Sequence, residues 1–481
     1  MKLLPFLAFL SLLLVSSPAR AAERPNIIYI LADDMGYGDL GCYGQKTLAT
    51  PGIDRMAAEG LRFTRHYAGC TVCAPSRCVL MTGLHTGHCR VRGNGMGSIP
   101  DGDLTLPGML KSAGYATLAV GKYGLGKPLP LDDPRKKGFD FFYGYVETSH
   151  AHNCFPPFLV KNGQIAELKN EQIPGSAFGK GNDEIKGTGV AAADGRVQWA
   201  PGLLGIEARK LVDAHAARKG TPFFLYYALN LPHANNEAKA DSPLGHGMES
   251  PDYGPFEEKD WPPAEKGFAF FMRFIDREVA SLLAVLKARG ADQNTLVIFS
   301  SDNGPHQEGG HKADFFQSSG ALNGIKRDLT EGGVRVPMIA WWPGRIKAGG
   351  VSDHVSGFQD MLPTFAELAG AVLDKPTDGI SMVPTFLGIG TQKQHDHLFW
   401  NFDEQGGKRS VLHWPWKLVH LNTGATGGAA KKAAAKPLEV QLFNLDTDPA
   451  ERQNVAVEHA DTVEKLAVKM REDWRAPEPV K

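Results

Sequence analysis

The chain has 481 residues, which is long for one compact core, so a large domain followed by a smaller one is expected. Hydrophobic residues make up 42% and charged residues 22% of the sequence, as is ordinary for a globular protein. The formal net charge of −1 gives no support to a general role in binding nucleic acid or membrane surfaces, so no nucleic-acid partner is expected.

The first residues have the pattern of a targeting segment. Lys2 precedes an apolar run over residues 3–15, and the small-x-small pattern of residues 19–21 follows. This predicts a signal peptide over residues 1–21 and export to the periplasm or the exterior. The alternative, a membrane anchor, is disfavoured because the run falls short of the roughly 20 apolar residues that span a bilayer. Stable membrane insertion is therefore not expected.

Three apolar runs without polar alternation predict strands that are buried on both faces of a parallel sheet. They lie at residues 26–32, 223–228 and 295–299, and each is followed by polar residues of the kinds that bind ligands. Helices are expected at 52–60, 106–112 and 268–289, with a further strand at 115–120. Alternating strands and helices predict an α/β fold, a large and mostly parallel mixed sheet sandwiched by helices. The active site of such folds lies beyond the carboxyl ends of the strands.

The pattern changes after residue 379. Short apolar runs at 397–402, 416–421 and 439–445 predict a small antiparallel sheet, and an amphipathic pattern at 463–474 predicts a closing helix. Residues 424–437 (GATGGAAKKAAAKP) are of low complexity and predict a flexible loop between two of these strands. The predicted domains are therefore residues 22–378 and 379–481.

The six cysteines all lie in the first third of the chain, and four are close together: Cys70, Cys73, Cys78 and Cys89. The Cys70-x-x-Cys73 spacing is compatible with a zinc site, but such sites pair two close clusters across a loop, and a second cluster is not evident here. Residues 73–77 (CAPSR) are followed by Thr82 and Gly83. Disulfide pairing is not deducible from the sequence.

Polar pairs after two of the buried strands suit a hard cation. Asp33 and Asp34 follow the strand at 26–32, while Asp302 and Asn303 follow the strand at 295–299. Oxygen ligands from two strand ends are what Ca²⁺ or Mg²⁺ prefers. A lone Asp-Asp pair more commonly caps a turn or helix, so from the residues alone both interpretations of these pairs stay open.

Together with GYATLAVGK (114–122), LPH (231–233) and GIKRDLTEGGVRVP (324–337), these motifs resemble those of the formylglycine-dependent sulfatases. These enzymes form a family of the alkaline-phosphatase-like superfamily. The resemblance extends from about Pro25 to about Val455. It implies that a maturation enzyme oxidises Cys73 to formylglycine, whose hydrate carries two hydroxyl groups. One attacks sulfur, and the second expels sulfate as the aldehyde re-forms, which a serine could not do.

The resemblance also implies a metal site and its neighbours. Asp33, Asp34, Asp302 and Asn303 would hold one Ca²⁺, or Mg²⁺, with the modified Cys73 as a further contact. The metal would act as a Lewis acid on a sulfate oxygen. An arginine four residues after Cys73, Arg77, would lie on the same helix face and stabilise the activated diol.

Three further residues are implied to contact the sulfate group. Lys122 would bind a sulfate oxygen, His233 would contact sulfate and protonate the leaving alcohol, and Lys326 would contact the bridging or leaving oxygen.

The sequence departs from the family pattern two residues after Lys122, where many sulfatases carry a histidine and this chain has Gly124. The base of the second step is therefore open, with His88, His150 and His152 as candidates. We favour His152, because its segment falls where other sulfatases place a polar residue that contacts sulfate, and because histidine exchanges protons near neutral pH.

The substrate expected from this resemblance is a sulfated carbohydrate, with galactose 4-sulfate and N-acetylgalactosamine 4-sulfate as candidates and an aryl sulfate as an artificial substrate. Loops at 153–198 and 234–261 are expected to shape the pocket. Two alternatives stay open, a hydrolase of phosphate mono- or diesters from the same superfamily and a non-catalytic secreted sugar-binding relative. The phosphate-ester hydrolases use a nucleophilic Ser or Thr and two metal ions with His ligands, and this sequence does not match that pattern.

Overall fold

The computed structural model describes residues 24–476 except for 96, 129, 180–183, 219 and 425–435. The predicted signal peptide at 1–21 and most of the predicted loop at 424–437 lie outside the described residues. No helix among the described residues is long and apolar enough to cross a membrane.

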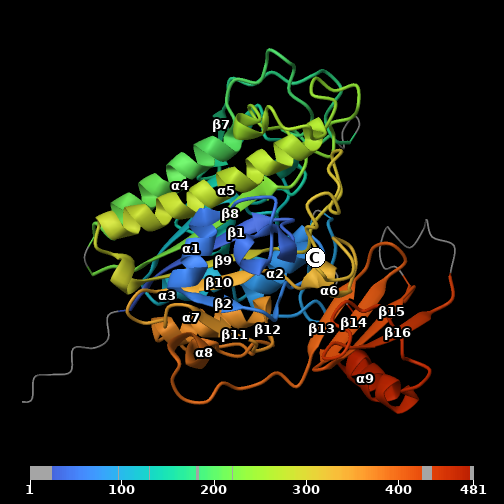
Figure 1. The fold of residues 1–481 in the computed structure, drawn as a ribbon. Helices are drawn as coiled ribbons and strands as arrows, with labels where there is room; N and C mark the ends of the chain where they lie inside the picture. Colours follow the sequence, from blue (N-terminus) through green and yellow to red (C-terminus); the bar gives the residue numbers. More distant parts are fainter. Residues whose placement is uncertain are drawn as a thin grey trace, which may run out of the picture.

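A large mixed sheet forms the body of the protein, with its five central strands parallel (Figure 1). Ten strands contribute within the described residues. In spatial order they are β11 (Gly350–Ser352), β2 (Leu61–Phe63), β10 (Met338–Trp341), β9 (Thr295–Ser301), β1 (Asn26–Asp33), β8 (Phe223–Pro232), β4 (Ala116–Lys122), β5 (Phe141–Tyr145), β6 (Phe158–Lys161) and β7 (Gln164–Glu167). The predicted sheet is confirmed, including its parallel centre.

Helices cover both faces of this sheet, as expected for strands that carry apolar residues on both faces. Along β1, residues 27, 29 and 31 pack into one core and residues 28, 30 and 32 into the other. The first core includes α2 (Cys73–Thr82), α3 (Leu106–Ser112), α7 (Met361–Ala369) and α8 (Val383–Leu387). The second includes α1 (Pro51–Glu59), α4 (Ala200–Ala216) and α5 (Pro263–Ala288), and α4 and α5 lie side by side in Figure 1.

Several elements differ from the sequence expectation. Helix α4 was not predicted, because Pro201, Gly202 and Gly205 lower its helix propensity and its stability comes from packing on α5 and the sheet. Helix α5 begins five residues earlier than predicted, with Pro263 in its first turn. The predicted loop at 153–198 contains strands β6 and β7.

The C-terminal part forms the expected antiparallel sheet and closing helix (Figure 1). Its strands are β13 (Leu398–Phe402), β14 (Lys408–His413), β15 (Trp416–Leu421) and β16 (Glu439–Asn444), and α9 (Ala460–Asp473) packs on them. Strand β14 was not predicted, since its charged start hides the short apolar centre. Small elements complete the fold: β3 (His66–Tyr67), β12 (Ser356–Gly357) and α6 (Glu331–Val334).

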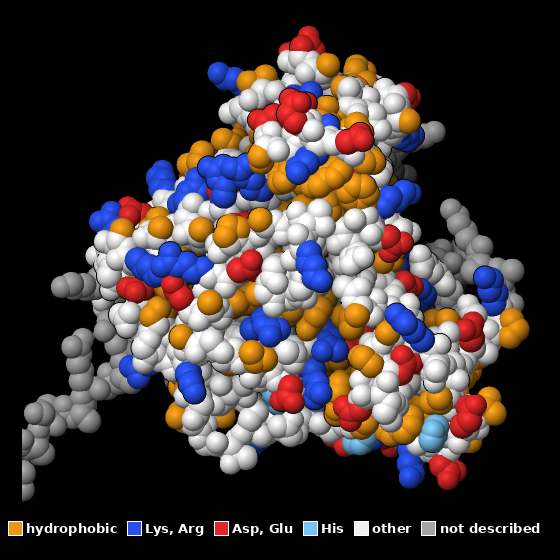
Figure 2. Space-filling model, in the orientation of Figure 1, with side chains coloured by type: hydrophobic (Ala, Val, Ile, Leu, Met, Phe, Trp, Pro, Cys, Tyr) orange, Lys and Arg blue, Asp and Glu red, His pale blue; other side chains and the backbone are white. Residues whose placement is uncertain are grey.

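The surface carries charges of both signs. On the face shown in Figure 2, Lys, Arg, Asp and Glu side chains are interspersed among neutral and hydrophobic ones. This agrees with the net charge of −1.

Candidate active site

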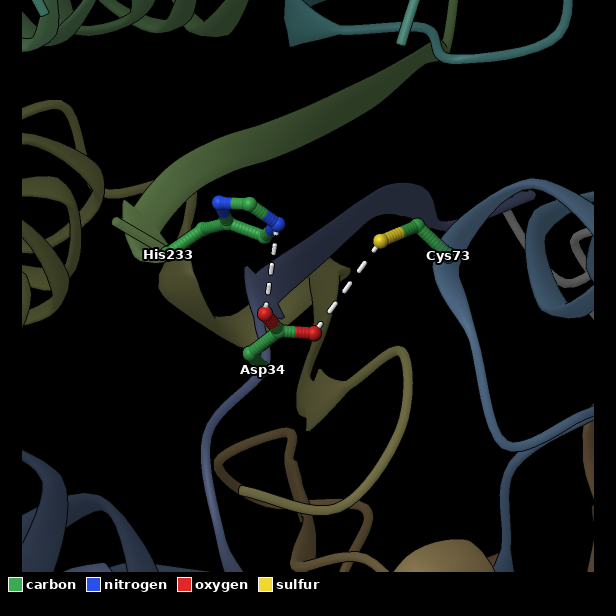
Figure 3. A group of neighbouring side chains, drawn as sticks. All are labelled: Asp34, Cys73 and His233. Atoms are coloured by element: carbon green, nitrogen blue, oxygen red, sulfur yellow. Dashed lines mark hydrogen bonds and ion pairs between the residues drawn. The ribbon is translucent and has the colours of Figure 1, made fainter. Parts of the chain in front are cut away.

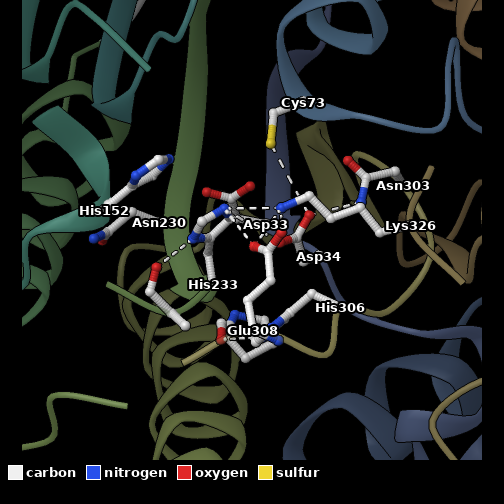
Figure 4. Close-up of polar contacts among 12 residues, drawn as sticks. Asp33, Asp34, Cys73, His152, Asn230, His233, Asn303, His306, Glu308 and Lys326 are labelled. Atoms are coloured by element: carbon white, nitrogen blue, oxygen red, sulfur yellow. Dashed lines mark hydrogen bonds and ion pairs between the residues drawn. The ribbon is translucent and has the colours of Figure 1, made fainter. Parts of the chain in front are cut away.

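Four elements bring most of the predicted site residues to one edge of the sheet (Figure 4). Strand β1 ends at Asp33 and β9 ends just before Asp302, so both pairs of polar residues follow neighbouring parallel strands. Strand β8 ends just before His233, and α2 begins at Cys73. Because parallel strands end on the same side of the sheet, residues far apart in the sequence meet here.

The metal-ligand candidates contact one another directly. Asn303 Nδ2 donates to Asp34 Oδ1 at 2.7 Å, and the Asp34 backbone N–H donates to Asp302 Oδ1 at 3.0 Å. The Cys73 thiol lies 4.0 Å from Asp34 Oδ1. Potential ligand atoms of Asp34, Cys73 and His233 all lie within 4.8 Å of one another, as Figure 3 shows for their side chains.

Each of the three carboxylates is matched by a buried cation. Lys122 Nζ lies 2.7 Å from Asp33 Oδ2, and Lys326 Nζ lies 2.8 Å from Asp34 Oδ2. The Asp302 carboxylate accepts from Arg77 Nη2 at 2.7 Å and from Arg77 Nε at 3.0 Å. Another nitrogen of Arg77, Nη1, donates to the Lys122 carbonyl oxygen at 2.6 Å. A divalent cation and a sulfate group could therefore enter with little change in net charge.

Burial and neighbouring charges shift the pKa values of this cluster in different directions. Burial opposes ionisation of Asp33, but Lys122, with His233 and Arg77, holds the pKa of this carboxyl well below its usual range. The pKa of Asp34 is also lowered, because the charges of Lys326 and His233 outweigh the effect of burial. For Asp302, burial and then repulsion from Asp33 raise the pKa to about 7. Burial raises the pKa of the Cys73 thiol well above its usual value, so an unmodified Cys73 is uncharged.

Two buried oxygens fit a bound cation. Asp33 Oδ1 and Asn303 Oδ1 receive no hydrogen bond within the described part of the chain. A buried acceptor without a donor costs free energy, and a hard divalent cation would satisfy both. Carboxylate and amide oxygens are the donor set that Ca²⁺ and Mg²⁺ prefer, so the residues present fit the implied ion.

His233 is held as a neutral imidazole next to a lysine. Its Nδ1 lies 2.6 Å from the Ala234 carbonyl oxygen, and its Nε2 lies 3.0 Å from Lys326 Nζ. Burial, followed by repulsion from Lys326, lowers the pKa of His233 well below its usual value. Glu308 also binds Lys326, with Oε2 2.8 Å from Nζ, so Lys326 bridges Asp34 and Glu308.

Of the three histidines considered for the second step, the structure brings only His152 into this cleft. His88 Nδ1 instead lies 2.9 Å from both carboxylate oxygens of Asp378, on another part of the molecule. His150 is buried, and its Nε2 lies 3.1 Å from the Phe158 carbonyl oxygen. The His152 ring stacks on His233, with centroids 4.5 Å apart and planes at 11°.

A cleft of about 680 Å³ opens over these side chains. His152, His233 and Lys326 lie in its lining, with residues from 173–179 and 236–242 forming further walls. The loops predicted to shape the pocket therefore both contribute to it.

Sequence reasoning missed several neighbours of the site. Glu308 and His306 follow the Asp302–Asn303 pair by a few residues, and His306 Nε2 lies 3.0 Å from the Pro232 carbonyl oxygen. Glu237 lies beside His152. The only available signal was their place in loops that follow buried strands, which does not show which residues turn inward.

The zinc alternative finds no support in the side-chain arrangement. All six cysteines lie in the described residues and are free thiols. In that part of the chain, no group of three or more potential metal-ligating side chains contains two cysteines. Cys70 Sγ instead lies 3.7 Å from the Asn401 carbonyl oxygen.

Comparison with known proteins identifies the family. The sulfatase family model matches residues 25–371, and the model of the N-sulphoglucosamine sulphohydrolase C-terminal region matches residues 325–476. Arylsulfatase A of Bos taurus is 33% identical, covering 93% of this chain and 85% of its own. N-acetylgalactosamine-6-sulfatase of Rattus norvegicus is 35% identical, covering 94% and 84%. The solved structure of Ps i-CgsB in complex with k-i-k-neocarrahexaose superposes with a TM-score of 0.74 at 26% identity, covering 95% and 94%. With its fold and the chemistry of its site, this chain belongs to the sulfatase family and is a sulfuric ester hydrolase.

Proposed function

We propose that this sulfatase removes sulfate from carbohydrate esters, using a formylglycine derived from Cys73 and one divalent cation. The observation that carries the proposal is the position of Cys73. Cys73 is the first residue of α2, and its side chain is buried among the carboxylates and lysines of the cluster. Its Sγ lies 4.0 Å from Asp34 Oδ1. A modified side chain here would be placed where a nucleophile and a sulfate group must meet.

The cation site is formed by Asp33, Asp34, Asp302 and Asn303, with residue 73 as a further contact. When bound, Ca²⁺ or Mg²⁺ would act as a Lewis acid on a sulfate oxygen. Arg77 holds Asp302 through two hydrogen bonds, so its contacts favour a role in fixing this carboxylate beside the nucleophile.

The buried lysines and histidines would bind sulfate and move protons. With a cation neutralising the carboxylates, Lys122 and Lys326 can direct their ammonium groups at sulfate oxygens. In this proposal His233, whose Nε2 lies 3.0 Å from Lys326 Nζ, contacts the sulfate group and passes a proton to the leaving alcohol. His152, one ring further out in the cleft, is the base for sulfate release in this proposal.

Relatives and cleft size support a sugar substrate. Ps i-CgsB binds a neocarrahexaose, and N-acetylgalactosamine-6-sulfatase is named for an amino sugar. The 680 Å³ cleft is large enough for a sugar unit beside the sulfate site. Galactose 4-sulfate and N-acetylgalactosamine 4-sulfate remain the candidates, and the similarity to arylsulfatase A supports an aryl sulfate as an assay substrate.

The proposal also covers the maturation and export of the protein. A formylglycine-generating enzyme would convert Cys73, and residues 1–21 would direct export to the periplasm or exterior. The mature protein would comprise a catalytic domain over 22–378 and a C-terminal subdomain over 379–481.

The decisive test is the mass of the tryptic peptide spanning residues 66–77, from protein made in a host that generates formylglycine. We expect an aldehyde or its hydrate at Cys73, while Cys70 in the same peptide keeps its thiol. Turnover of an aryl sulfate should disappear in Cys73→Ala and persist in Cys70→Ala. An unmodified Cys73 in a competent host, with no sulfate released from sulfated sugars, would refute the proposal.

A further inference from the structure

Gly124 stands where many sulfatases carry a histidine, and the backbone at this position disfavours any side chain. Its φ is +70°, and a Cβ there would lie 3.2 Å from Arg77 Cδ. Any group that does the same work must therefore come from another element. We propose that Glu237 is the positioning residue that fixes the ring of His152 as a proton acceptor, so that the His152–Glu237 pair takes the place of the missing histidine. This inference rests on the proposed function.

The two side chains face each other on the cleft wall. His152 Nδ1 lies 3.5 Å from Glu237 Oε1, and the side chains are 13% and 7% exposed. Both line the 680 Å³ cleft. His152 Nδ1 and Glu237 Oε2 are buried and have no hydrogen-bond partner in the described part of the chain. The gap is slightly longer than a hydrogen bond, as is common for catalytic contacts before substrate binds.

Glu237 depends on His152 for charge compensation. Among the described residues, no Lys or Arg nitrogen lies within 4.0 Å of this carboxylate, whereas Asp33, Asp34 and Asp302 each have at least one. A poorly solvated carboxylate is stabilised by the one positive charge that can form beside it. Among the described residues, the ring of His152 lies beside this carboxylate and can carry such a charge when a proton is transferred to it.

The backbone at Glu237 is held in place by the side chain of Asn235. Asn235 Oδ1 accepts from the Glu237 backbone N–H at 3.1 Å. The amide of Asn235 donates to Glu249 Oε2 at 2.9 Å and to the Gly189 carbonyl oxygen at 2.8 Å. Asn235 is fully buried, so this anchor holds the loop against the wall formed by the 189 segment. These hydrogen bonds hold the loop so that the Glu237 carboxylate stays close to the ring of His152.

A carboxylate beside Nδ1 selects one tautomer of histidine. It favours the form with the proton on Nδ1, and the lone pair of Nε2 is then free to accept a proton. Stacking on His233 fixes the plane of the ring. When a proton is transferred to Nε2, the Glu237 carboxylate beside Nδ1 stabilises the positive charge that forms on the ring.

The step assigned to this pair is the release of sulfate. His152 Nε2 takes the proton of the hydroxyl group that remains on residue 73. The electron pair of that O–H bond forms the carbonyl bond, and the pair of the breaking carbon–oxygen bond leaves with sulfate. The products are an aldehyde, sulfate and protonated His152, so atoms and charges balance.

The first measurement uses unconverted protein and needs no catalysis. The ¹⁵N chemical shifts of the His152 ring report which nitrogen carries the proton, with His152→Gln identifying the signals. We expect the Nδ1–H form in the native protein and a loss of that preference in Glu237→Gln and Glu237→Met. Glu167→Gln is the matched control, because it removes one exposed carboxylate from β7, outside the residues that line the cleft.

The second measurement separates positioning from folding or binding. With the converted enzyme and an aryl sulfate, Glu237→Gln should lower kcat about 10- to 100-fold without raising KM, within the range of general acid–base effects. A rapid burst of one alcohol per site should precede the slow phase, because sulfate release becomes limiting. Glu167→Gln should show neither effect.

The results distinguish this inference from the proposed function. If Glu237→Gln keeps both the tautomer and the kcat of the native enzyme, while Cys73→Ala is inactive, the positioning role is wrong and the sulfatase mechanism stands. If the tautomer changes but kcat and the burst do not, His152 is not the base and the inference is overturned. If Cys73 is never converted, the kinetic test fails for every variant, whereas the tautomer result still reports on the pair.

Discussion

Replacing Lys417 with methionine should destabilise the protein by about 3–5 kcal/mol, the usual cost of removing one partner from a buried ion pair. Lys417 lies in β15 with its side chain fully buried, 2.8 Å from Glu331 Oε1 and 3.2 Å from Glu451 Oε1. Without the ammonium group, Glu331 keeps Tyr67 Oη at 2.9 Å and Arg335 Nη1 at 3.2 Å.

Glu451 would lose its only cationic partner within 4.0 Å among the described residues. Burial already raises its pKa to about 7, although Lys417 opposes this shift. The variant therefore leaves a carboxyl that must either protonate or stay charged in the interior. A second replacement, Glu451→Gln, should recover part of the loss, because it removes that charge. Since Glu331 joins the catalytic body to the C-terminal sheet through Lys417, the effect is on folding rather than on the chemistry.

Equilibrium urea unfolding, followed by the fluorescence of tryptophans such as Trp400 and Trp416 in the same sheet, measures the change. Lys469→Met is the control. Lys469 pairs with Asp396 at 2.5 Å, but the two side chains are 28% and 62% exposed, so removing this surface pair should cost less than about 1 kcal/mol. Equal destabilisation by the two variants, or a double variant no more stable than Lys417→Met, would refute the reasoning.

Three further predictions concern the sheet, acid stability and the cation. Gly121→Ala should lower the free energy of unfolding by more than about 4 kcal/mol or prevent soluble expression, because φ is +104° and the new Cβ would lie 1.9 Å from the Ala228 carbonyl oxygen. Gly290→Ala is the control: no atom lies within 4 Å of its new Cβ, so it should cost about 1 kcal/mol. Thermal melting of the two variants measures the difference. Burial lowers the pKa of His66 to about 3, so the unfolded chain binds the extra proton and the contribution of His66 to stability is lost as pH falls from about 6.5 through 3. Unfolding at several pH values should show a shallower acid dependence in His66→Asn, and an unchanged slope would contradict this. Chelation followed by desalting should lower Tm and abolish aryl sulfate turnover, and added Ca²⁺ or Mg²⁺ should restore both; a metal-free protein with native Tm and activity would show that no cation is needed.

Local patterns in the sequence predicted the central sheet and candidate site residues that the structure brings close together. The run at 26–32 has no polar alternation, which required burial on both faces, and β1 contributes to cores on both sides. The polar pairs after two such strands predicted a shared edge, and Asp34 and Asp302 are in hydrogen-bond contact there. These features follow from the period of side-chain burial and from strand direction, which a single sequence displays.

The tertiary structure decided which side chains contact one another across long separations. Arg77 was expected to face the activated nucleophile because of its four-residue spacing from Cys73, and the structure adds hydrogen bonds to Asp302 and the Lys122 carbonyl oxygen that this spacing does not predict. Glu308 binds Lys326, and no spacing rule connects them.

The choice among His88, His150 and His152 shows the same division. All three are histidines in loops or short turns, so composition and spacing could not rank them physically. The packing of His150 against the Phe158 carbonyl, the pairing of His88 with Asp378, and the stacking of His152 on His233 separate them. By itself, the sequence determined the parallel sheet, the ligand-bearing strand ends and the cysteine motif, because each depends on neighbours in the chain. Only the tertiary structure decided which loop residues turn into the cleft, because that depends on contacts between segments that the chain brings together only when it folds.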